Sequence, residues 1–306
     1  MSYSRDVKNE LCARRITSAP RFESLLGRSA RSDILAECYG ILLYCNTFST
    51  REIRIITENE RLAERVTALF SECFGVDFDS TRAPESGKRS LLIMDKRKLN
   101  AIFDAFELMP QDTISHHINL GVLEDETSHS AFLRGAFLAG GSVTDPAKSY
   151  HLELVTPHRS VSRETVSLLQ EQNFSPKHLE RSGNYIVYFK QSSAIEDFLT
   201  FIGASGSAME LMSAKIEKDM RNSVNRRVNC DTANVSKTVD AAAAQLEAIA
   251  RLDLSTLPEK LCETARLRLE NPELSLTELA ELFEPPVTKS GLNHRLRKLK
   301  ELSENT

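Results

Sequence analysis

The strongest indication of the fold is the stretch Ala131-Phe-Leu-Arg-Gly-Ala-Phe-Leu-Ala-Gly-Gly-Ser-Val143. Its apolar residues predict a buried helix, and Gly140-Gly141 supplies the backbone freedom to end that helix. Gly135 leaves one face of the helix without a side chain, at a cost of about 0.5–1 kcal/mol relative to alanine. Because close contact with another backbone would offset this cost, the stretch predicts a second, similar helix packed against it.

A second glycine-bearing helix is predicted at Ile34–Cys45, where Gly40 lies among apolar residues. Ser32 or Asp33 is expected to cap its start, and Asn46 is expected to end it in the left-handed conformation. The two helices should pack on each other along a pseudo-two-fold axis.

Similar elements follow each of these helices. The helix at 34–45 is followed by predicted strands at 52–57, 76–78 and 90–94 and helices at 60–74 and 99–108. The helix at 131–143 is followed by predicted strands at 149–156, 177–181 and 185–189 and helices at 160–170 and 193–202. A short helix at 4–11, capped by Ser4, precedes both, and breaks are expected at Pro20 and Pro110. This self-similarity predicts an α+β domain at residues 1–203, a pseudo-two-fold αββαββα repeat whose antiparallel sheets form a saddle.

The composition of the 306-residue chain is that of an ordinary globular protein of about two domains. Its net charge of −4 means that any surface for nucleic acid must be local. The six cysteines form no CxxC pair or zinc spacing, so they are expected to be small buried residues in a reducing cytosol, and no metal or cofactor is expected. Because a signal peptide and a membrane-spanning run are both missing, the chain is expected to be cytoplasmic.

A change of composition follows the predicted saddle. The small residues 203–208 are expected to form a linker, and helices are predicted at 209–220 and 237–252. Residues 204–220 are therefore interpreted as a linker or connecting helix. Residues 221–306 are interpreted as an all-α DNA-binding domain with a helix-turn-helix at about 274–303.

The helix-turn-helix is predicted from its local pattern. Ser275 and Glu278 have capping-box spacing at the start of a short helix, and a Pro-Pro turn follows at 284–287. Thr288 or Ser290 is expected to cap a second helix, whose core positions are Leu292, Leu296 and Leu299. In such a motif the N-terminal part of the second helix enters the major groove of DNA.

The charges of this segment are segregated by sign. Acids accompany the first helix at Glu270, Glu273, Glu278, Glu281 and Glu284, whereas residues 285–300 contain no acid and five Lys or Arg. A merely solvated helix usually mixes signs, so this segregation favours a surface that faces phosphates. The alternative is a basic-faced structural helix in a three-helix bundle.

Candidate contacts to DNA fall into three groups. Ser290, Asn293 and His294 lie where base edges are met, and Asn suits a bidentate contact to adenine. The cations of the second helix, expected to hold phosphates, are Lys289, Arg295, Arg297, Lys298 and Lys300. A second contact is expected at Arg221, Asn225, Arg226 and Arg227, for which a solvated helix is the alternative.

The stretch around Gly135 resembles the motif of LAGLIDADG homing endonucleases. The matching residues are Leu133, Gly135, Ala139, Gly141 and Ser142. In active members an acid at the end of each motif helix binds the divalent metals, and the corresponding positions here are Cys45 and Gly140. Since neither is a hard oxygen ligand, the resemblance implies a fold without nuclease activity.

Nearly the whole chain is similar to the WhiA family of bacterial DNA-binding proteins. The similarity is most specific at Ala131–Leu154, Arg221–Lys237 and Pro285–Arg297. It implies a nucleoid-associated transcriptional regulator that binds double-stranded DNA, and other transcription or division factors as protein partners. It also implies a role in sporulation in sporulating relatives, and in cell division and chromosome segregation elsewhere.

Two other hypotheses stay open. The saddle could bind a protein or a small molecule, with Arg51, Arg54, Lys148 and His151 along it, or the chain could be a metal-dependent endonuclease.

Overall fold

The computed structural model describes residues 2–16, 30–82, 87–108 and 115–304. The chain divides into two compact units, Met1–Lys218 and Asp219–Thr306. The predicted breaks at Pro20 and Pro110 lie outside the described residues. Within the described ranges, no helix is both long and apolar enough to cross a membrane.

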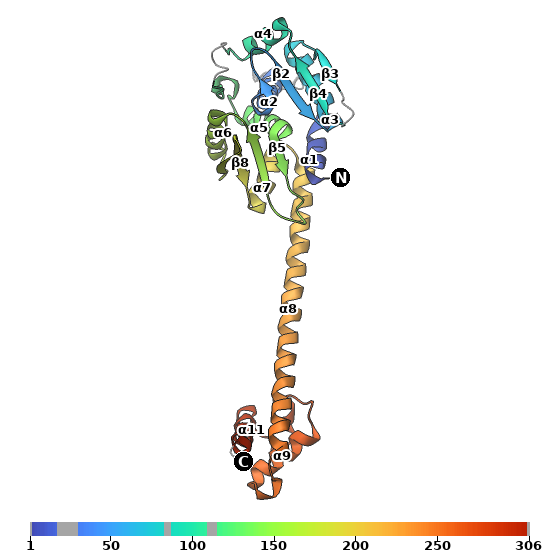
Figure 1. The fold of residues 1–306 in the computed structure, drawn as a ribbon, viewed down its shortest axis with the longest axis vertical. Coiled ribbons are helices and arrows are strands. Elements are labelled where there is room, and N and C mark those ends of the chain that lie inside the picture. Colours follow the sequence, from blue (N-terminus) through green and yellow to red (C-terminus); the bar gives the residue numbers. More distant parts are fainter. Residues whose placement is uncertain (1, 17–29, 83–86, 109–114, 305–306) are drawn as a thin grey trace. The chain divides into compact units, whose positions relative to one another are not determined.

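The first unit confirms the predicted double repeat (Figure 1). A helix α1 (Tyr3–Cys12) precedes it, and a short 3₁₀ helix η3 (Leu120–Val122) lies between the copies. The first copy consists of α2 (Ala30–Tyr44), β1 (Thr47–Phe48), β2 (Ile53–Thr57), α3 (Glu60–Phe74), β3 (Ser80–Arg82), β4 (Arg89–Ile93) and α4 (Lys96–Ala105). The second consists of α5 (Glu126–Gly140), β5 (Gly141–Val143), β6 (Leu152–Thr156), α6 (Arg159–Glu171), β7 (Lys177–Arg181), β8 (Asn184–Phe189) and α7 (Ser192–Ile202).

The two sheets have the same topology. Their strand orders are β1-β2-β4-β3 and β5-β6-β8-β7, and every described pairing is antiparallel. The registers also correspond, because Phe48 pairs with Ile53 in one sheet and Val143 with Leu152 in the other. The fold is therefore the predicted α+β pseudo-two-fold repeat. The first strand of each copy was missed by sequence reasoning because two or three residues are too short to show alternation.

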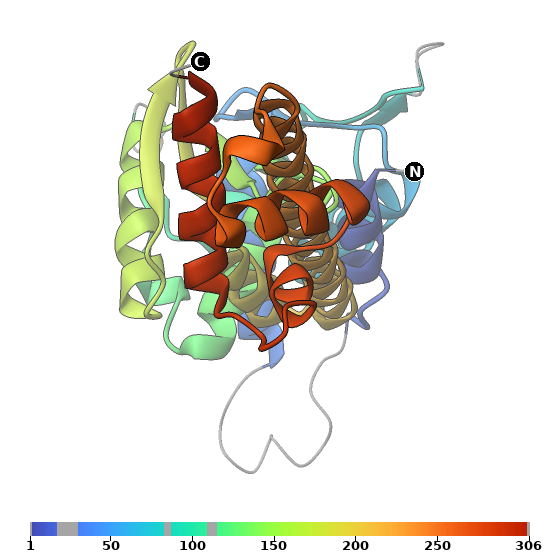
Figure 2. The same cartoon turned by 90° about the horizontal axis from the view of Figure 1, so that it is seen from below.

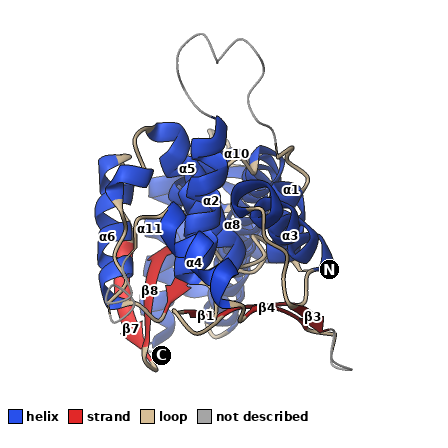
Figure 3. Ribbon diagram, turned by 90° about the horizontal axis from the view of Figure 1, so that it is seen from above, coloured by secondary structure: helices blue, strands red, loops and turns tan. Residues whose placement is uncertain are grey.

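The two glycine-bearing helices α2 and α5 lie side by side at the centre of this unit (Figure 3). A Cβ atom on Gly40 would lie 2.0 Å from the carbonyl oxygen of Phe132, and one on Gly135 would lie 2.1 Å from that of Glu37. Gly135 stands 95 positions after Gly40, and Phe132 stands 95 positions after Glu37. The contact is thus reciprocal, as expected for a pseudo-two-fold axis between the helices.

The ends of these helices differ from prediction. Gly141 follows α5 in an ordinary extended conformation (φ −89°), which any residue can adopt. Glycine is needed there because a Cβ atom would lie 2.4 Å from the Phe137 ring. Asn46 is not left-handed either; its side-chain oxygen accepts a hydrogen bond from Ile56 N at 2.8 Å. Ser32 and Asp33 lie inside the first turn of α2 and do not precede it.

Two further predictions in this unit were wrong. Helix α1 has Ser2 rather than Ser4 at its N-cap position. The third strand of the first copy is β3, not 76–78, because Val76 is buried and Phe78 packs against Phe70 at a ring distance of 5.0 Å. Both side chains serve the core, and ladder pairing begins only after them.

A buried ion cluster joins α2, α3 and α5. Glu37 accepts hydrogen bonds from Arg65 at 2.6 and 2.9 Å and from Arg134 at 2.9 Å. Burial favours protonation of Glu37, but the hydrogen bonds from Arg65 and the charge of Arg134 outweigh it and hold its pKa below the usual value. The cluster therefore tolerates burial because each charge has a partner.

The predicted linker at 203–208 is wrong. Helix α8 (Ser205–Ala250) begins there, and Ala204, Ser207 and Ala208 are buried. The carboxylate of Glu10 accepts hydrogen bonds from the Gly206 and Ser207 N–H groups at 2.7 and 2.8 Å, which satisfies backbone donors of the first turn. The helices predicted at 209–220 and 237–252 are parts of this one 46-residue helix.

The second unit is all-helical, as predicted. After the end of α8 come a 3₁₀ helix η4 (Leu254–Thr256), α9 (Glu259–Glu270), α10 (Leu276–Glu281) and α11 (Lys289–Glu304). Figure 2 shows these helices, orange to red, gathered together. Their shared core consists of Ile249, Leu261, Ala265, Leu279, Ala280, Phe283, Leu292, Leu296 and Leu299.

Candidate nucleic-acid interface

Helices α10 and α11 and the turn between them have the local structure of a helix-turn-helix. Ser275 Oγ accepts a hydrogen bond from Glu278 N at 3.4 Å, and Glu278 accepts one from Ser275 N at 2.9 Å, so the predicted capping box is formed. Thr288 Oγ1 accepts a hydrogen bond from Gly291 N at 3.1 Å. Of the two predicted caps of α11, Thr288 is therefore the one used, and Ser290 is left outside this role.

The core face of α11 fixes which side chains it presents. Leu292, Leu296 and Leu299 are buried, as predicted, with at most 3% of their surface exposed. Successive side chains of a helix point about 100° apart. The outer face, away from these leucines, therefore carries Ser290, Asn293, His294 and Arg297. The structure thus brings the three predicted base-reading residues together with one arginine.

The charge on this outer face changes along the helix. Lys289, Lys298 and Lys300 are exposed, and Arg297 lies 3.4 Å from His294 Nδ1 and 3.6 Å from Glu301 Oε1. Acids return only in the last turns, at Glu301 and Glu304. The part of α11 that can approach phosphates without repulsion is therefore its first three turns.

Arg295 is oriented differently from the other cations. Its guanidinium lies 5.3 Å from the centre of the Phe283 ring, and its Nη1 is 4.0 Å from Glu263 Oε2 on α9. Only 23% of its side chain is exposed. Arg295 was predicted to hold phosphate, but this geometry ties α11 to α9 and to the turn that follows α10.

Sequence reasoning missed Arg268, which is the largest fully buried side chain of the unit. Its Nη1 donates a hydrogen bond of 2.6 Å to the Leu274 carbonyl, just before α10. Burial lowers the pKa of Arg268. The sequence shows only an arginine in the last turn of a helix, which is normally a solvated position.

The second predicted group of DNA contacts lies on α8. Arg221, Asn225, Arg226 and Arg227 are all exposed on this single helix. Arg226 and Arg227 are successive residues and point about 100° apart, so the four side chains do not share one face. They are available to a partner but are not brought together as the α11 residues are.

The two positions that were predicted to correspond to the metal ligands of active LAGLIDADG endonucleases lie at the ends of α2 and α5. The offset of 95 positions that relates the packing glycines also relates Cys45 to Gly140. A Cβ at Gly140 would lie 2.4 Å from the Val155 carbonyl oxygen, so there is no room for a carboxylate. The Cys45 thiol lies 3.1 Å from the Leu42 carbonyl oxygen and 3.2 Å from that of Thr47, and burial raises its pKa to about 12.

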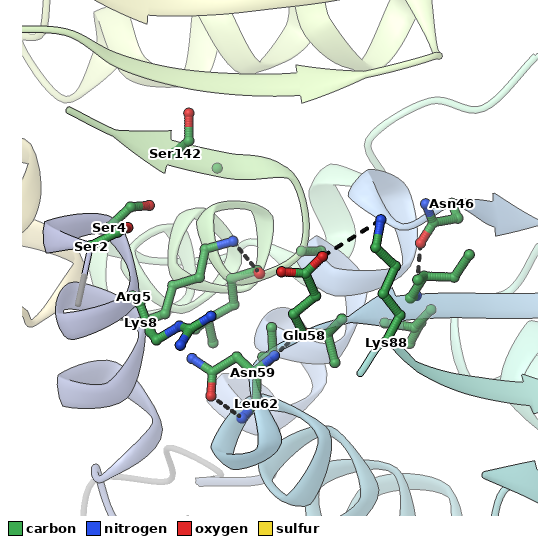
Figure 4. A pocket seen from close by; sticks show the side chains of 16 residues that line it. Ser2, Ser4, Arg5, Lys8, Asn46, Glu58, Asn59, Leu62, Lys88 and Ser142 are labelled. Atoms are coloured by element: carbon green, nitrogen blue, oxygen red, sulfur yellow. Dashed lines mark hydrogen bonds and ion pairs between the residues drawn. The ribbon is translucent and has the colours of Figure 1, made fainter. Parts of the chain in front are cut away.

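A pocket of about 460 Å³ opens beside these helix ends (Figure 4). Its lining includes Arg5, Lys8 and Lys88, with Glu58 as its acid. Lys8 Nζ donates a hydrogen bond of 3.0 Å to the Leu138 carbonyl, and burial lowers its pKa to about 8. Lys88 forms an ion pair of 3.5 Å with Glu58. The lining is thus cationic, and nowhere among the described residues do three His, Cys, Asp or Glu side chains form a metal-binding group.

Mixed charge surrounds the residues that were considered for the saddle. Arg54 pairs with Glu52 at 2.8 Å, and His151 lies 3.2 Å from Glu153. Arg51 and Lys148 are exposed. Of the residues considered for the saddle, Arg54 is therefore neutralised by a neighbouring acid, and His151 also has an acid beside it.

The fold and site define a class in which a LAGLIDADG-like domain precedes a helix-turn-helix. Residues 129–221 match the family model of the WhiA LAGLIDADG-like domain, and residues 224–303 match that of the WhiA C-terminal HTH domain. The chain is 38% identical to the probable cell division protein WhiA of Ruminiclostridium cellulolyticum, over 99% of this chain and 97% of the relative. It is 35% identical to that of Clostridium botulinum, over 99% and 98%. The chain belongs to the WhiA family.

A crystal structure supports the same assignment of the fold. Full-length WhiA from Thermotoga maritima matches 100% of this chain and 99% of its own, with a TM-score of 0.60 and 23% sequence identity. The N-terminal LAGLIDADG domain of WhiA, solved alone, matches 66% of this chain and 92% of its own with a TM-score of 0.50 and 20% identity.

Proposed function

We propose that this chain is a sequence-specific, DNA-binding transcriptional regulator that acts on double-stranded DNA in the nucleoid. The observation that carries the proposal is the outer face of α11, where Ser290, Asn293, His294 and Arg297 are exposed together in an acid-free segment. Polar side chains near the start of a helix can read base edges, and flanking cations can hold phosphates. We assign the role to residues 221–306, with the helix-turn-helix at 274–303.

The proposed process follows from the family. Relatives carry the name probable cell division protein WhiA, so we propose that the regulated genes serve cell division and chromosome segregation. In a sporulating host the same regulator would act in sporulation. Protein partners, such as other transcription or division factors, would act with it at these genes.

We also propose that the chain is not a nuclease. Gly140 offers no ligand, and the Cys45 thiol stays protonated and soft, so neither helix end supplies the hard oxygen that a two-metal mechanism needs. The cationic pocket beside them would repel a divalent ion. Supercoiled plasmid should remain intact when it is incubated with excess protein and Mg²⁺ or Mn²⁺. Nicking of the plasmid would overturn this part of the proposal. Nicking that a Cys45→Ala variant retains would show that the metal site lies elsewhere.

The experiment for the main proposal separates base reading from phosphate contact. Bound fragments are first identified by genome-wide mapping in cells, and binding to one of them is measured by fluorescence anisotropy against a scrambled fragment. Asn293→Ala should reduce the preference for the mapped fragment by about tenfold, since one good bidentate contact is worth ~1–3 kcal/mol of discrimination. Arg297→Ala should weaken binding to both fragments alike.

The matched control is Arg251→Ala, which removes an exposed arginine paired with Glu247 near the end of α8. It should leave both affinities unchanged. Equal binding of the mapped and scrambled fragments by the unmodified chain would refute sequence-specific recognition.

A further inference from the structure

An apolar stripe runs along the exposed part of α8 and has no role in the proposed DNA contact. Its members, all in the second unit, are Met220, Val224, Val228, Val235 and Val239, of which 66, 60, 55, 63 and 60% of the surface is exposed. Met and Val side chains so exposed are costly on a helix in water and mark an interaction surface when they are contiguous. Farther along the same helix Ile249 is buried in the core of the second unit.

The spacing of the stripe reads the same in both directions. The positions 220, 224, 228, 231, 235 and 239 follow one another at intervals of four, four, three, four and four, so the row is symmetric about the point midway between Val228 and Asp231. This is an 11-residue repeat, which keeps side chains on one face of a nearly straight helix. Because the order is palindromic, an antiparallel copy of α8 has the same row of side chains, so that Val224 meets Val235, Met220 meets Val239 and Val228 meets Asp231 of the second copy.

Charges along the helix favour this antiparallel direction. Arg221, Arg226 and Arg227 lie before the centre of the stripe, and Asp231 and Asp240 lie after it. Each half also has one charge of the other sign, Asp219 and Lys237, so the N-terminal half is net positive and the C-terminal half net negative. Of these charges, Arg221, Arg227 and Asp231 lie within about 60° of the stripe. A parallel pair would place Arg221 and Arg227 beside their own copies, whereas an antiparallel pair can bring Arg227 to Asp231.

Asp231, the polar residue within the stripe, also has a partner in this arrangement. Residues 227 and 231 flank the same edge of the stripe, and the palindromic register brings Arg227 beside Asp231 of the second copy. A single polar residue in an apolar row is a common means of fixing register. Arg226 lies on the opposite face of the helix, at about 200° from Val224 and Val228, and stays free for another contact.

We propose that the Met220–Val239 stripe of α8 is a self-association surface, on which a second copy of this chain binds through the same stripe in antiparallel orientation. The test compares oligomeric state by light scattering and sedimentation for the full chain and for variants at exposed helix positions. Val224→Glu alone and Val235→Lys alone should each raise the dimer dissociation constant by about a hundredfold, since each buries charges opposite valines.

Combining the two substitutions in one chain distinguishes the orientation. In an antiparallel dimer the glutamate introduced at position 224 meets the lysine introduced at position 235 of the second copy, so the double variant Val224→Glu/Val235→Lys should dimerise again. In a parallel dimer like charges meet and the dimer stays lost. Ala233→Glu, exposed on the far side of the helix, is the matched control and should leave dimerisation unchanged. A monomeric parent chain, single variants that still dimerise, or a double variant that stays monomeric would each overturn the proposal.

Discussion

The α2–α5 helix pair and helix α11 differ in where their charged side chains lie: those at the contact within the pair are buried, and most of those of α11 are exposed. In the pair, Gly40 and Gly135 remove side chains so that two backbones touch, and the buried carboxylate of Glu37 is matched by two arginines. In α11 an apolar face anchors the helix, while cations on its first turns remain exposed without a row of matching acids. The LAGLIDADG-like motif thus keeps the glycines of its helix contact, whereas in α11 Lys289, Lys298 and Lys300 stay exposed where a polyanion can supply the compensating charge.

The largest expected effect comes from breaking the glycine contact. Gly135→Val should destabilise the first unit by about 4 kcal/mol or more, because its Cβ would overlap the Glu37 carbonyl and neither backbone can move freely. Chemical denaturation followed by circular dichroism measures the change. Gly183→Asn is the control: Gly183 has φ +77° in open space, a conformation that Asn tolerates, and should cost less than about 1 kcal/mol. Equal costs for the two variants would contradict the close packing of α2 and α5.

The next effect concerns the buried charge. Glu37→Gln should destabilise the chain by about 3 kcal/mol at neutral pH, because two buried arginines lose their counter-charge. The pKa of Glu37 in the folded chain lies below its ordinary value of 4.5, so its contribution to stability is present above that pH and is lost as the pH falls below it. The difference in unfolding free energy between the variant and the parent should therefore shrink as urea titrations are moved from neutral pH to below pH 4.5. A difference that grows on acidification would contradict the ionised state of Glu37.

A smaller effect separates stability from binding within the helix-turn-helix. Ser275→Ala should cost about 1 kcal/mol of stability in the second unit, because it removes the hydroxyl of the capping box. Ser290→Ala is the matched control, since Ser290 is exposed and Thr288 is the cap of α11. It should change stability by less than about 0.5 kcal/mol and yet weaken DNA binding. Thermal unfolding and anisotropy on the same samples test both statements; a larger stability loss for Ser290→Ala would reassign the cap.

The sequence predicted those features that depend on local spacing. The two glycines in apolar helices indicated the helix pair, and Ser275 with Glu278 indicated the start of α10, because each signal lies within a few residues. Strand β1 could not be found, since two residues show no period. The continuity of α8 was missed because Gly203–Ala208 has linker composition, and the carboxylate of Glu10 that caps the helix lies far away in the sequence.

The candidate site was predictable to the same degree. Helical spacing places Ser290, Asn293, His294 and Arg297 on one face, and the structure has them there. The inward orientation of Arg295 depends on Phe283 and on Glu263, which lie outside its own helix. The spacing of residues along one helix cannot predict contacts with other elements. The structure was therefore needed to distinguish Arg295, which packs against the core, from the cations that remain exposed.

The proposed DNA contact depends on the exposed cations of α11, which meet DNA phosphates in this proposal. The most direct measurement is the salt dependence of the affinity for one mapped fragment, compared between the parent chain and an Arg297→Ala/Lys298→Ala variant. If each cation displaces one counterion, the slope of log K against log salt should become shallower by about 2, and Arg251→Ala should leave it unchanged. An identical slope for the parent and the double variant, at comparable stability, would contradict a phosphate contact by these two cations.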